Sequence, residues 1–177
     1  MSTQQDNRPR IVVGVDGSPS SKEALAWAVR QASLVDGVID AVIAWEYPQF
    51  YGSFGWMPPM GQDLNLDGAA AQVLDDTIAT VTGAEPAVDI HSRVEYGTPA
   101  GVLLAAAEGA SLLVLGNRGH GGFAEALLGS VGQHCTQHSP CPIVIVRGQE
   151  QPQPAAPGPE AASLRRDAPD APDARDQ

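Results

Sequence analysis

The chain has 177 residues, a formal net charge of −11 and a single lysine, Lys22. Proteins that bind nucleic acids or anionic membranes without specificity carry a surplus of Lys and Arg, so this charge balance argues against both kinds of partner. No apolar run approaches the ~20 residues of a membrane span, and the polar N-terminus lacks a signal-peptide core, so we expect a cytoplasmic protein.

Composition divides the chain into three parts. Residues 1–9 are polar and unpatterned, and we predict a disordered arm. Residues 10–148 carry the apolar patterns and are predicted to form one domain. Residues 149–177 consist largely of Pro, Ala, Gln and Asp. Such a segment buries too little surface to offset its chain entropy, which predicts a disordered tail.

Strand and helix patterns alternate along the middle part. The run 11–15 is continuously apolar and β-branched, as in a strand buried on both faces. A helix is then expected from Ser20, which forms a capping box with Glu23, to Gly37. The remaining patterns predict strands at 38–45, 88–95, from Leu112 and at 143–147, and helices at 66–81, 98–107 and 129–138.

This alternation predicts an α/β fold of the Rossmann-like kind. It is a five-stranded parallel sheet in the order 3-2-1-4-5 with helices on both faces. The run 88–95 alternates apolar and polar residues, which indicates an edge strand with His91 on its polar side. Ligands bind such folds where the first and fourth strands separate, outside their carboxyl ends.

The loop after Leu115 carries the strongest chemical signal in the chain. An apolar run ends in Gly116 and Gly119, and Gly129 with Ser130 then opens a new helical segment. The first amides of a helix have no intrahelical partner, and the helix dipole makes that end positive. Glycines let the backbone approach phosphate oxygens closely. This junction therefore predicts an anion site.

These segments together resemble the universal stress protein family over residues 10–148. The spacing Gly-x2-Gly-x9-Gly-Ser is met in full and follows a strand, with the other segments in the family's order. The residues that carry the resemblance are Val12–Ser18, Gly97–Pro99, Gly116–Gly119, Gly129–Val131 and Cys141–Val146.

The resemblance implies the ATP-binding branch of that family. Asp16 would lie near the adenosine or its metal, or would simply cap the turn before the first helix. Ala44 would meet adenine through its backbone, with Ile43 or Trp45 in that place after a one-residue slip. A triphosphate would bring Mg²⁺. The residues expected to hold ribose and phosphates are Gly116, Arg118, Gly119, Gly129, Ser130 and Val131.

Catalytic residues are not predicted. There is no Walker-type Gly-Lys-Ser/Thr sequence and no lysine in these segments. We therefore expect an ATP-binding regulatory protein of stress physiology with little or no hydrolysis. Two alternatives stay open: a slow ATPase in which Asp16 and Arg118 assist water, and a nucleotide-independent interaction module. Other nucleotides, including AMP and cyclic AMP, also remain candidates.

Two segments suggest contacts with other molecules. The last strand, Ile143 to Val146, is apolar and would lie at a sheet edge; edges invite pairing, and the family resemblance implies a homodimer there. Residues 46–63 form a long loop, which predicts either a contact surface for an unidentified protein partner or a mobile segment. The aromatic residues of this loop are Tyr47, Phe50, Tyr51, Phe54 and Trp56.

Cys135 and Cys141 are expected to be free thiols in a reducing compartment. His134 and His138 share a helix face four residues apart and could in principle hold a metal. With no carboxylate or Cys-x-x-Cys beside them, the sequence favours a solvated or packed helix face instead.

Overall fold

The computed structural model describes residues 8–47, 65–83, 86–119 and 128–148. Within these residues, parallel strands and helices alternate as the sequence predicts, and the sheet has the order β3-β2-β1-β4-β5. The elements are β1 (Arg10–Gly14), α1 (Pro19–Val35), β2 (Val38–Trp45), α2 (Leu66–Thr82), β3 (Ile90–Tyr96), α3 (Pro99–Ala106), β4 (Leu112–Gly116), α4 (Ser130–His138) and β5 (Ile143–Val146).

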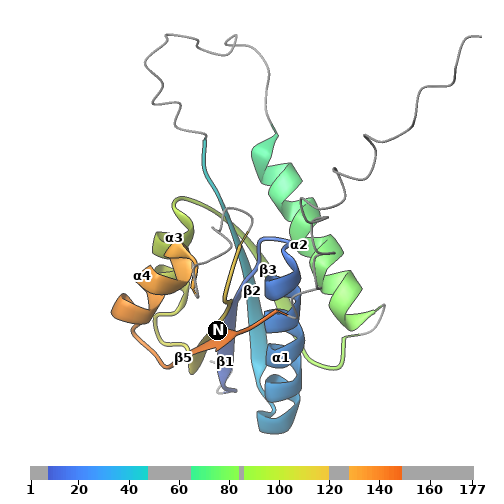
Figure 1. The fold of residues 1–177 in the computed structure, drawn as a ribbon. Helices are drawn as coiled ribbons and strands as arrows, with labels where there is room; N and C mark the ends of the chain where they lie inside the picture. Colours follow the sequence, from blue (N-terminus) through green and yellow to red (C-terminus); the bar gives the residue numbers. More distant parts are fainter. Residues whose placement is uncertain (1–7, 48–64, 84–85, 120–127, 149–177) are drawn as a thin grey trace, which may run out of the picture.

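Helices cover both faces of the sheet (Figure 1). Helices α1 and α2 lie on one face, and α3 and α4 lie on the other. Side chains alternate between the faces along each strand, so the core has two halves. Ile11, Val13 and Leu25 belong to the half beneath α1 and α2, whereas Val12 and Leu113 belong to the half beneath α3 and α4.

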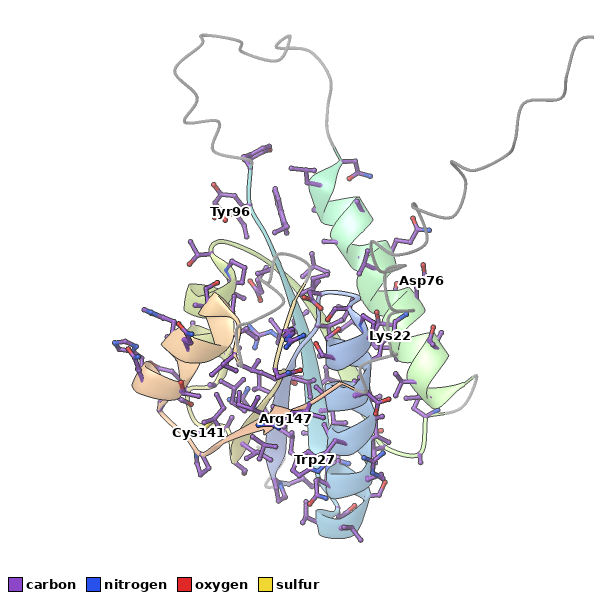
Figure 2. The ribbon with its side chains drawn as sticks, viewed as in Figure 1. Lys22, Trp27, Asp76, Tyr96, Cys141 and Arg147 are labelled. Atoms are coloured by element: carbon purple, nitrogen blue, oxygen red, sulfur yellow. The ribbon has the colours of Figure 1, made fainter. Side chains whose placement is uncertain are left out.

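The two edges of the sheet are β3 and β5. The edge position of β3 and the exposed side of His91 are confirmed, although the strand begins at Ile90 rather than Val88. The four residues of β5 are all half-buried. The β3 edge ends in Tyr96, which pairs with Trp45 at the end of β2 and is labelled there in Figure 2.

The start of α1 differs from the prediction. The N-cap is Ser18 rather than Ser20: the Ser18 hydroxyl accepts a hydrogen bond from the Ser21 amide at 3.2 Å. Pro19 occupies the first turn, where its missing N–H is not needed and its fixed φ suits the helix. The predicted capping box is therefore wrong. The Ser20 hydroxyl instead bonds the Arg118 carbonyl.

The other helix ends agree with the sequence to within a residue or two. Helix α3 follows Thr98 at the N-cap and has Pro99 at its start, but Thr98 makes no side-chain capping bond. Helix α4 follows Gly129 at its N-cap. Among the described residues, no helix combines the length and apolar character that a bilayer crossing requires.

Three aromatic rings meet where β2 and β3 end. The Trp45 ring lies 5.0 Å from that of Tyr96 and 5.5 Å from that of Tyr47, both in edge-to-face geometry. The rest of the aromatic loop lies outside the described residues. The same holds for most of the predicted arm and for the whole predicted tail, which stay predictions.

Candidate functional site

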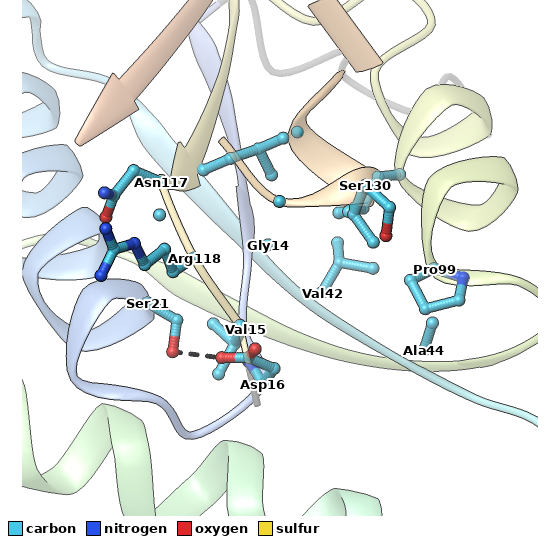
Figure 3. A pocket seen from close by; sticks show the side chains of 17 residues that line it. Gly14, Val15, Asp16, Ser21, Val42, Ala44, Pro99, Asn117, Arg118 and Ser130 are labelled. Carbon is cyan, nitrogen blue, oxygen red and sulfur yellow. Dashed lines mark hydrogen bonds between the residues drawn. The ribbon is translucent and has the colours of Figure 1, made fainter. Parts of the chain in front are cut away.

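A cavity of about 260 Å³ opens at the carboxyl ends of β1 and β4 (Figure 3). These are the neighbouring strands at which the chain order of the sheet reverses. All eight residues that the sequence singled out line this cavity, although they come from four separate segments. They are Asp16, Ala44, Gly116, Arg118, Gly119, Gly129, Ser130 and Val131.

One end of the cavity is apolar. Val42 and Ala44 reach it from β2, Leu103 from α3, and Pro99 from the first turn of α3. Figure 3 shows Val42, Ala44 and Pro99 together on one side of the opening. A flat apolar group such as a nucleobase suits a wall of this kind, because binding removes its faces from water.

The glycines of the loop keep the backbone close to its neighbours. A Cβ at Gly116 would lie 2.6 Å from the Ser20 hydroxyl, and one at Gly119 would lie 2.6 Å from the Asp16 carboxylate. Gly129 has more room, with its nearest neighbour 3.8 Å away. Side chains at the first two positions would fill space or force the loop to move.

The first turn of α4 borders the cavity with Ser130 and Val131. The loop holds this turn in place, because the Gly129 amide donates to the Asn117 carbonyl at 2.9 Å. The N-cap is a glycine and supplies no side-chain capping bond. Amides in the first turn of a helix have no carbonyl of their own helix to bond, so this turn is suited to receive an anion.

Among the described residues that line the cavity, Asp16 and Arg118 are the two that carry charge. The exposed Asp16 carboxylate accepts a hydrogen bond from the Ser18 amide at 3.0 Å. It therefore caps the turn before α1 while it also borders the cavity, so both roles considered for it are compatible. Figure 3 shows the Arg118 side chain extending on the side of Asn117, away from Val42 and Ala44.

Sequence reasoning missed the residues that hold the glycine loop. The Ser20 hydroxyl donates to the Arg118 carbonyl, and the Ser18 hydroxyl lies 3.5 Å from the same oxygen. Asn117 bonds the end of β5, since its amide donates to the Val146 carbonyl and its side chain accepts from the Gly148 amide. The sequence does contain a sign of these contacts, which is the run of serines after Asp16. The predicted capping box gave a role to only one of those serines.

Helix α4 also carries a buried cysteine. Cys135 packs into the half of the core beneath α3 and α4, and desolvation by burial raises the pKa of its thiol. Both Cys135 and Cys141 are free thiols, as expected. Among the residues that the structure describes, no group of three or more His, Cys, Asp and Glu side chains could hold a metal.

The fold is that of a doubly wound α/β protein, and the cavity lies at its switch point, where ligands bind in folds of this kind. The family model for the universal stress protein family matches residues 7–147. The chain belongs to that family.

Relatives and solved structures agree with this assignment. A universal stress protein of Mycolicibacterium smegmatis is 34% identical over 145 residues, which cover 80% of this chain and 47% of the relative. This chain spans about half the length of the curated relatives that it matches. A crystal structure of a universal stress protein in complex with cAMP has a TM-score of 0.56 and 28% identity, covering 80% of this chain and 98% of that one.

A more distant structure shares the fold alone. It is a universal stress protein family protein from Arabidopsis thaliana with AMP bound, with a TM-score of 0.54 and 17% identity. The match covers 83% of this chain and 96% of that one.

Proposed function

We propose that the cavity binds an adenine nucleotide, with ATP as the principal ligand, and that the chain acts as a nucleotide-dependent regulatory protein in the stress response. The observation that carries this proposal is the convergence of eight motif residues on one cavity. The base would lie against Val42 and Ala44, and the phosphates would lie against the glycine loop and the first turn of α4.

A neighbour of 28% identity supports a ligand of this class, because it was crystallised in complex with cAMP. Backbone amides recognise phosphate more than they recognise the base, so AMP and cyclic AMP are the natural competitors of ATP at this site.

Magnesium would enter the site with a triphosphate. Asp16 offers one carboxylate beside Gly119, at the edge of the phosphate loop. A single carboxylate fits Mg²⁺, which usually keeps several waters and takes further oxygens from the substrate's phosphates. Asp16 would then bind the ion directly or through a water molecule, and phosphate oxygens would complete the coordination shell of the ion.

We further propose that bound ATP turns over slowly or not at all. Phosphoryl transfer needs an oriented nucleophile and cations that neutralise the charge on the phosphates, and Arg118 is the only cationic side chain among the cavity residues that the structure describes. The alternative, a slow ATPase that uses Asp16, is tested by phosphate release. Release at equal rates from the wild type and from Asp16→Ala would remove that alternative.

Equilibrium dialysis with labelled ATP, AMP and cyclic AMP tests the site. We expect Gly119→Glu to weaken ATP binding at least about tenfold, or about 1.4 kcal/mol, because it adds a negative charge beside Asp16 where phosphates would lie. The matched control is Ala79→Glu, which adds the same charge on the exposed face of α2. Equal affinity of Gly119→Glu and wild type would refute the assigned site. A wild-type chain that binds none of the three nucleotides would refute the function.

The open edge of β5 supports a second proposal, a homodimer that pairs through Ile143–Val146. These residues are half-buried and hydrogen bond to β4 along one side. An exposed apolar edge strand is a template for another strand. Sedimentation velocity at micromolar concentration is expected to show a dimer, and a monomer would contradict this proposal.

A further inference from the structure

The aromatic cluster of Trp45, Tyr47 and Tyr96 is open to solvent where β2 and β3 end. Tyr47 is 56% exposed and Tyr96 is 64% exposed, although the ring of each packs edge-to-face against Trp45. The two tyrosine rings are tilted by 57° with their centroids 6.2 Å apart, so they are not stacked on each other. Trp45 anchors the cluster, because it packs against the half of the core beneath α1 and α2. Aromatic surface gathered in this way at one exposed place is typical of a contact site.

The sequence after β5 contains a segment of matching chemistry. Residues 149–177 lie outside the described residues, and they include the P-x-x-P stretch Pro154–Pro157, with Pro152 before it and Pro159 after it. Segments of this kind favour the extended polyproline II conformation. Aromatic-lined surfaces bind them, because that conformation is already formed before binding and little chain entropy is lost.

The described chain ends on the side of the molecule that carries the aromatic cluster. Its last residue, Gly148, lies against the first turn of α1, since a Cβ there would be 3.0 Å from the Cα of Ser20. Helix α1 covers the sheet face against which Trp45 packs (Figure 1). The strands are parallel, so β2 and β5 also end at the same edge of the sheet.

The segment is long enough to reach the aromatic cluster. Neighbouring strands lie about 4.8 Å apart and rise about 3.3 Å per residue. Tyr47 lies five residues beyond Val42, which is the partner of Gly14 at the end of β1. The rings belong to strands one and two places from β1, so the span from the start of α1 is roughly 15–20 Å. Polyproline II advances about 3.1 Å per residue, so the six residues from Gly148 to Pro154 cover about 19 Å.

Charge distinguishes this stretch from the second P-x-x-P stretch of the tail. Glu46 is exposed and lies between Trp45 and Tyr47 in the chain, whereas Glu95 beside Tyr96 is paired with Arg93 at 2.9 Å. Residues 151–159 carry no charge, but residues 167–173, which contain the second stretch, carry three aspartates. A negative segment would be repelled by Glu46, so the uncharged segment fits the cluster better.

We propose that residues 152–159 dock on the aromatic cluster of the same chain, with proline rings packed on the faces of Tyr47 and Tyr96. Single contacts of this kind are weak. A short linker raises the effective concentration of the segment to the millimolar range, which makes weak docking sufficient. The cluster is separate from the nucleotide cavity, so the proposal does not depend on the proposed function.

NMR of the full chain without nucleotide tests the proposal through the indole N–H signals of its three tryptophans. The signal of Trp45 is assigned by its loss in Trp45→Phe. We expect Pro154→Ala/Pro157→Ala to shift the Trp45 signal and to leave that of Trp27, on α1, in place. An unchanged Trp45 signal would overturn the proposal. The two substitutions lie outside the described fold, so a shift reports the loss of docking and not a change in the core.

The second P-x-x-P stretch offers a matched control. Pro169→Ala/Pro172→Ala removes two prolines of the same spacing from the same tail. This variant should leave the Trp45 signal where it is in the wild type. Equal shifts in the two double variants would show that residues 152–159 are not the docked segment.

A further pair of measurements distinguishes docking within one chain from other contacts. In Tyr47→Ala/Tyr96→Ala, the additional change Pro154→Ala/Pro157→Ala should have no effect on the Trp45 signal, because the surface has been removed. A shift of the same size in this background would place the contact elsewhere and overturn the proposal. The difference between wild type and Pro154→Ala/Pro157→Ala should persist on dilution. A difference that disappears on dilution would assign the segment to a second copy and overturn docking within one chain.

Discussion

The same face of β2 meets two different polar environments at its two ends. At the carboxyl end, Ala44 borders the open cavity with its glycine loop. Four residues earlier, Asp40 is buried, with a side chain that is 9% exposed, and its carboxylate is enclosed by other side chains. Arg10 bonds it at 2.9 Å, His91 Nδ1 lies 3.3 Å away and Arg93 lies 3.6 Å away.

The two environments differ in what satisfies their polar groups. The Asp40 cluster is closed within the protein, and Arg10 also donates to the Ala106 carbonyl at the end of α3. At the cavity, by contrast, backbone groups of the loop and of the first turn of α4 face a space large enough for a ligand. Polar groups that are enclosed with their partners mainly stabilise the fold, while backbone groups that border a cavity can also contact a ligand. We therefore expect variants of the two clusters to have separable effects.

The largest expected effect is that of Asp40→Ala on stability. It leaves Arg10 without its carboxylate partner, and we expect a loss of about 2–3 kcal/mol in the free energy of unfolding. This lies at or below the low end of the range of about 3–5 kcal/mol for broken buried pairs, because Arg10 and Arg93 are partly exposed. Urea unfolding at neutral pH measures this loss. Asp76→Ala, which removes an exposed carboxylate from α2, serves as the control. If Asp40→Ala lowered the nucleotide affinity of the folded protein, the Asp40 cluster and the cavity would not have separable effects.

Gly116→Ala is expected to affect both properties. Its Cβ would lie 2.6 Å from the Ser20 hydroxyl and 2.8 Å from the Ser20 carbonyl carbon, so backbone must move. Overpacking of this kind costs about 1–3 kcal/mol, and the displaced loop should bind nucleotide more weakly. Gly129→Ala is the contrast, because its Cβ would make only ordinary contacts. Thermal unfolding measures the difference, and Gly116→Ala should have the lower melting temperature. Equal melting temperatures of the two variants would contradict this prediction.

Ser20→Ala should weaken both stability and the binding of phosphorylated ligands, each by a modest amount. It removes the donor to the Arg118 carbonyl, and we expect about 0.5–1.5 kcal/mol lower stability together with a several-fold loss of affinity for phosphorylated ligands. Adenosine, which lacks phosphate, should bind equally to variant and wild type. Ser33→Ala removes a comparable hydroxyl that bonds within α1 and should change neither. An equal loss for adenosine and ATP would show that Ser20 does not position the phosphate loop.

The smallest expected effect concerns the thiol of Cys135 on the buried face of α4. Because burial raises the pKa of Cys135, less of its reactive thiolate is present, and Cys141 should be alkylated first at mildly alkaline pH. Mass spectrometry of iodoacetamide-treated peptides gives the two rates. The folded state holds the Cys135 proton more tightly than the unfolded state does, so its contribution to stability is lost as the pH rises above the ordinary thiol value of 9.0. Faster labelling of Cys135 would indicate that α4 leaves the sheet readily.

Much of the fold could be predicted from local patterns. The alternation of strands and helices could be predicted from continuous apolar runs at 11–15 and 38–45 and from the helical periodicity between them. That alternation in turn predicts a parallel sheet. The errors lie at element ends, where Ser18 rather than Ser20 caps α1. Neighbouring serines have similar capping preferences. Which of them caps the helix depends on a tertiary contact, here the hydrogen bond from Ser20 to the Arg118 carbonyl in the glycine loop.

The glycine spacing and its position after a strand identified the loop residues that line the cavity, because a close approach of the backbone requires glycine. Asp16 followed from the expected switch point and Ala44 only from the resemblance to the universal stress protein family, and the sequence did not predict lining residues such as Val42 and Leu103. Tertiary structure alone decided that Ser20 and Asn117 hold that lining. It also decided that Arg10, His91 and Arg93 enclose Asp40 and that the two α4 histidines face solvent. These pairings join residues far apart in sequence, and strand register and helix rotation, which no local pattern encodes, determine which side chains meet.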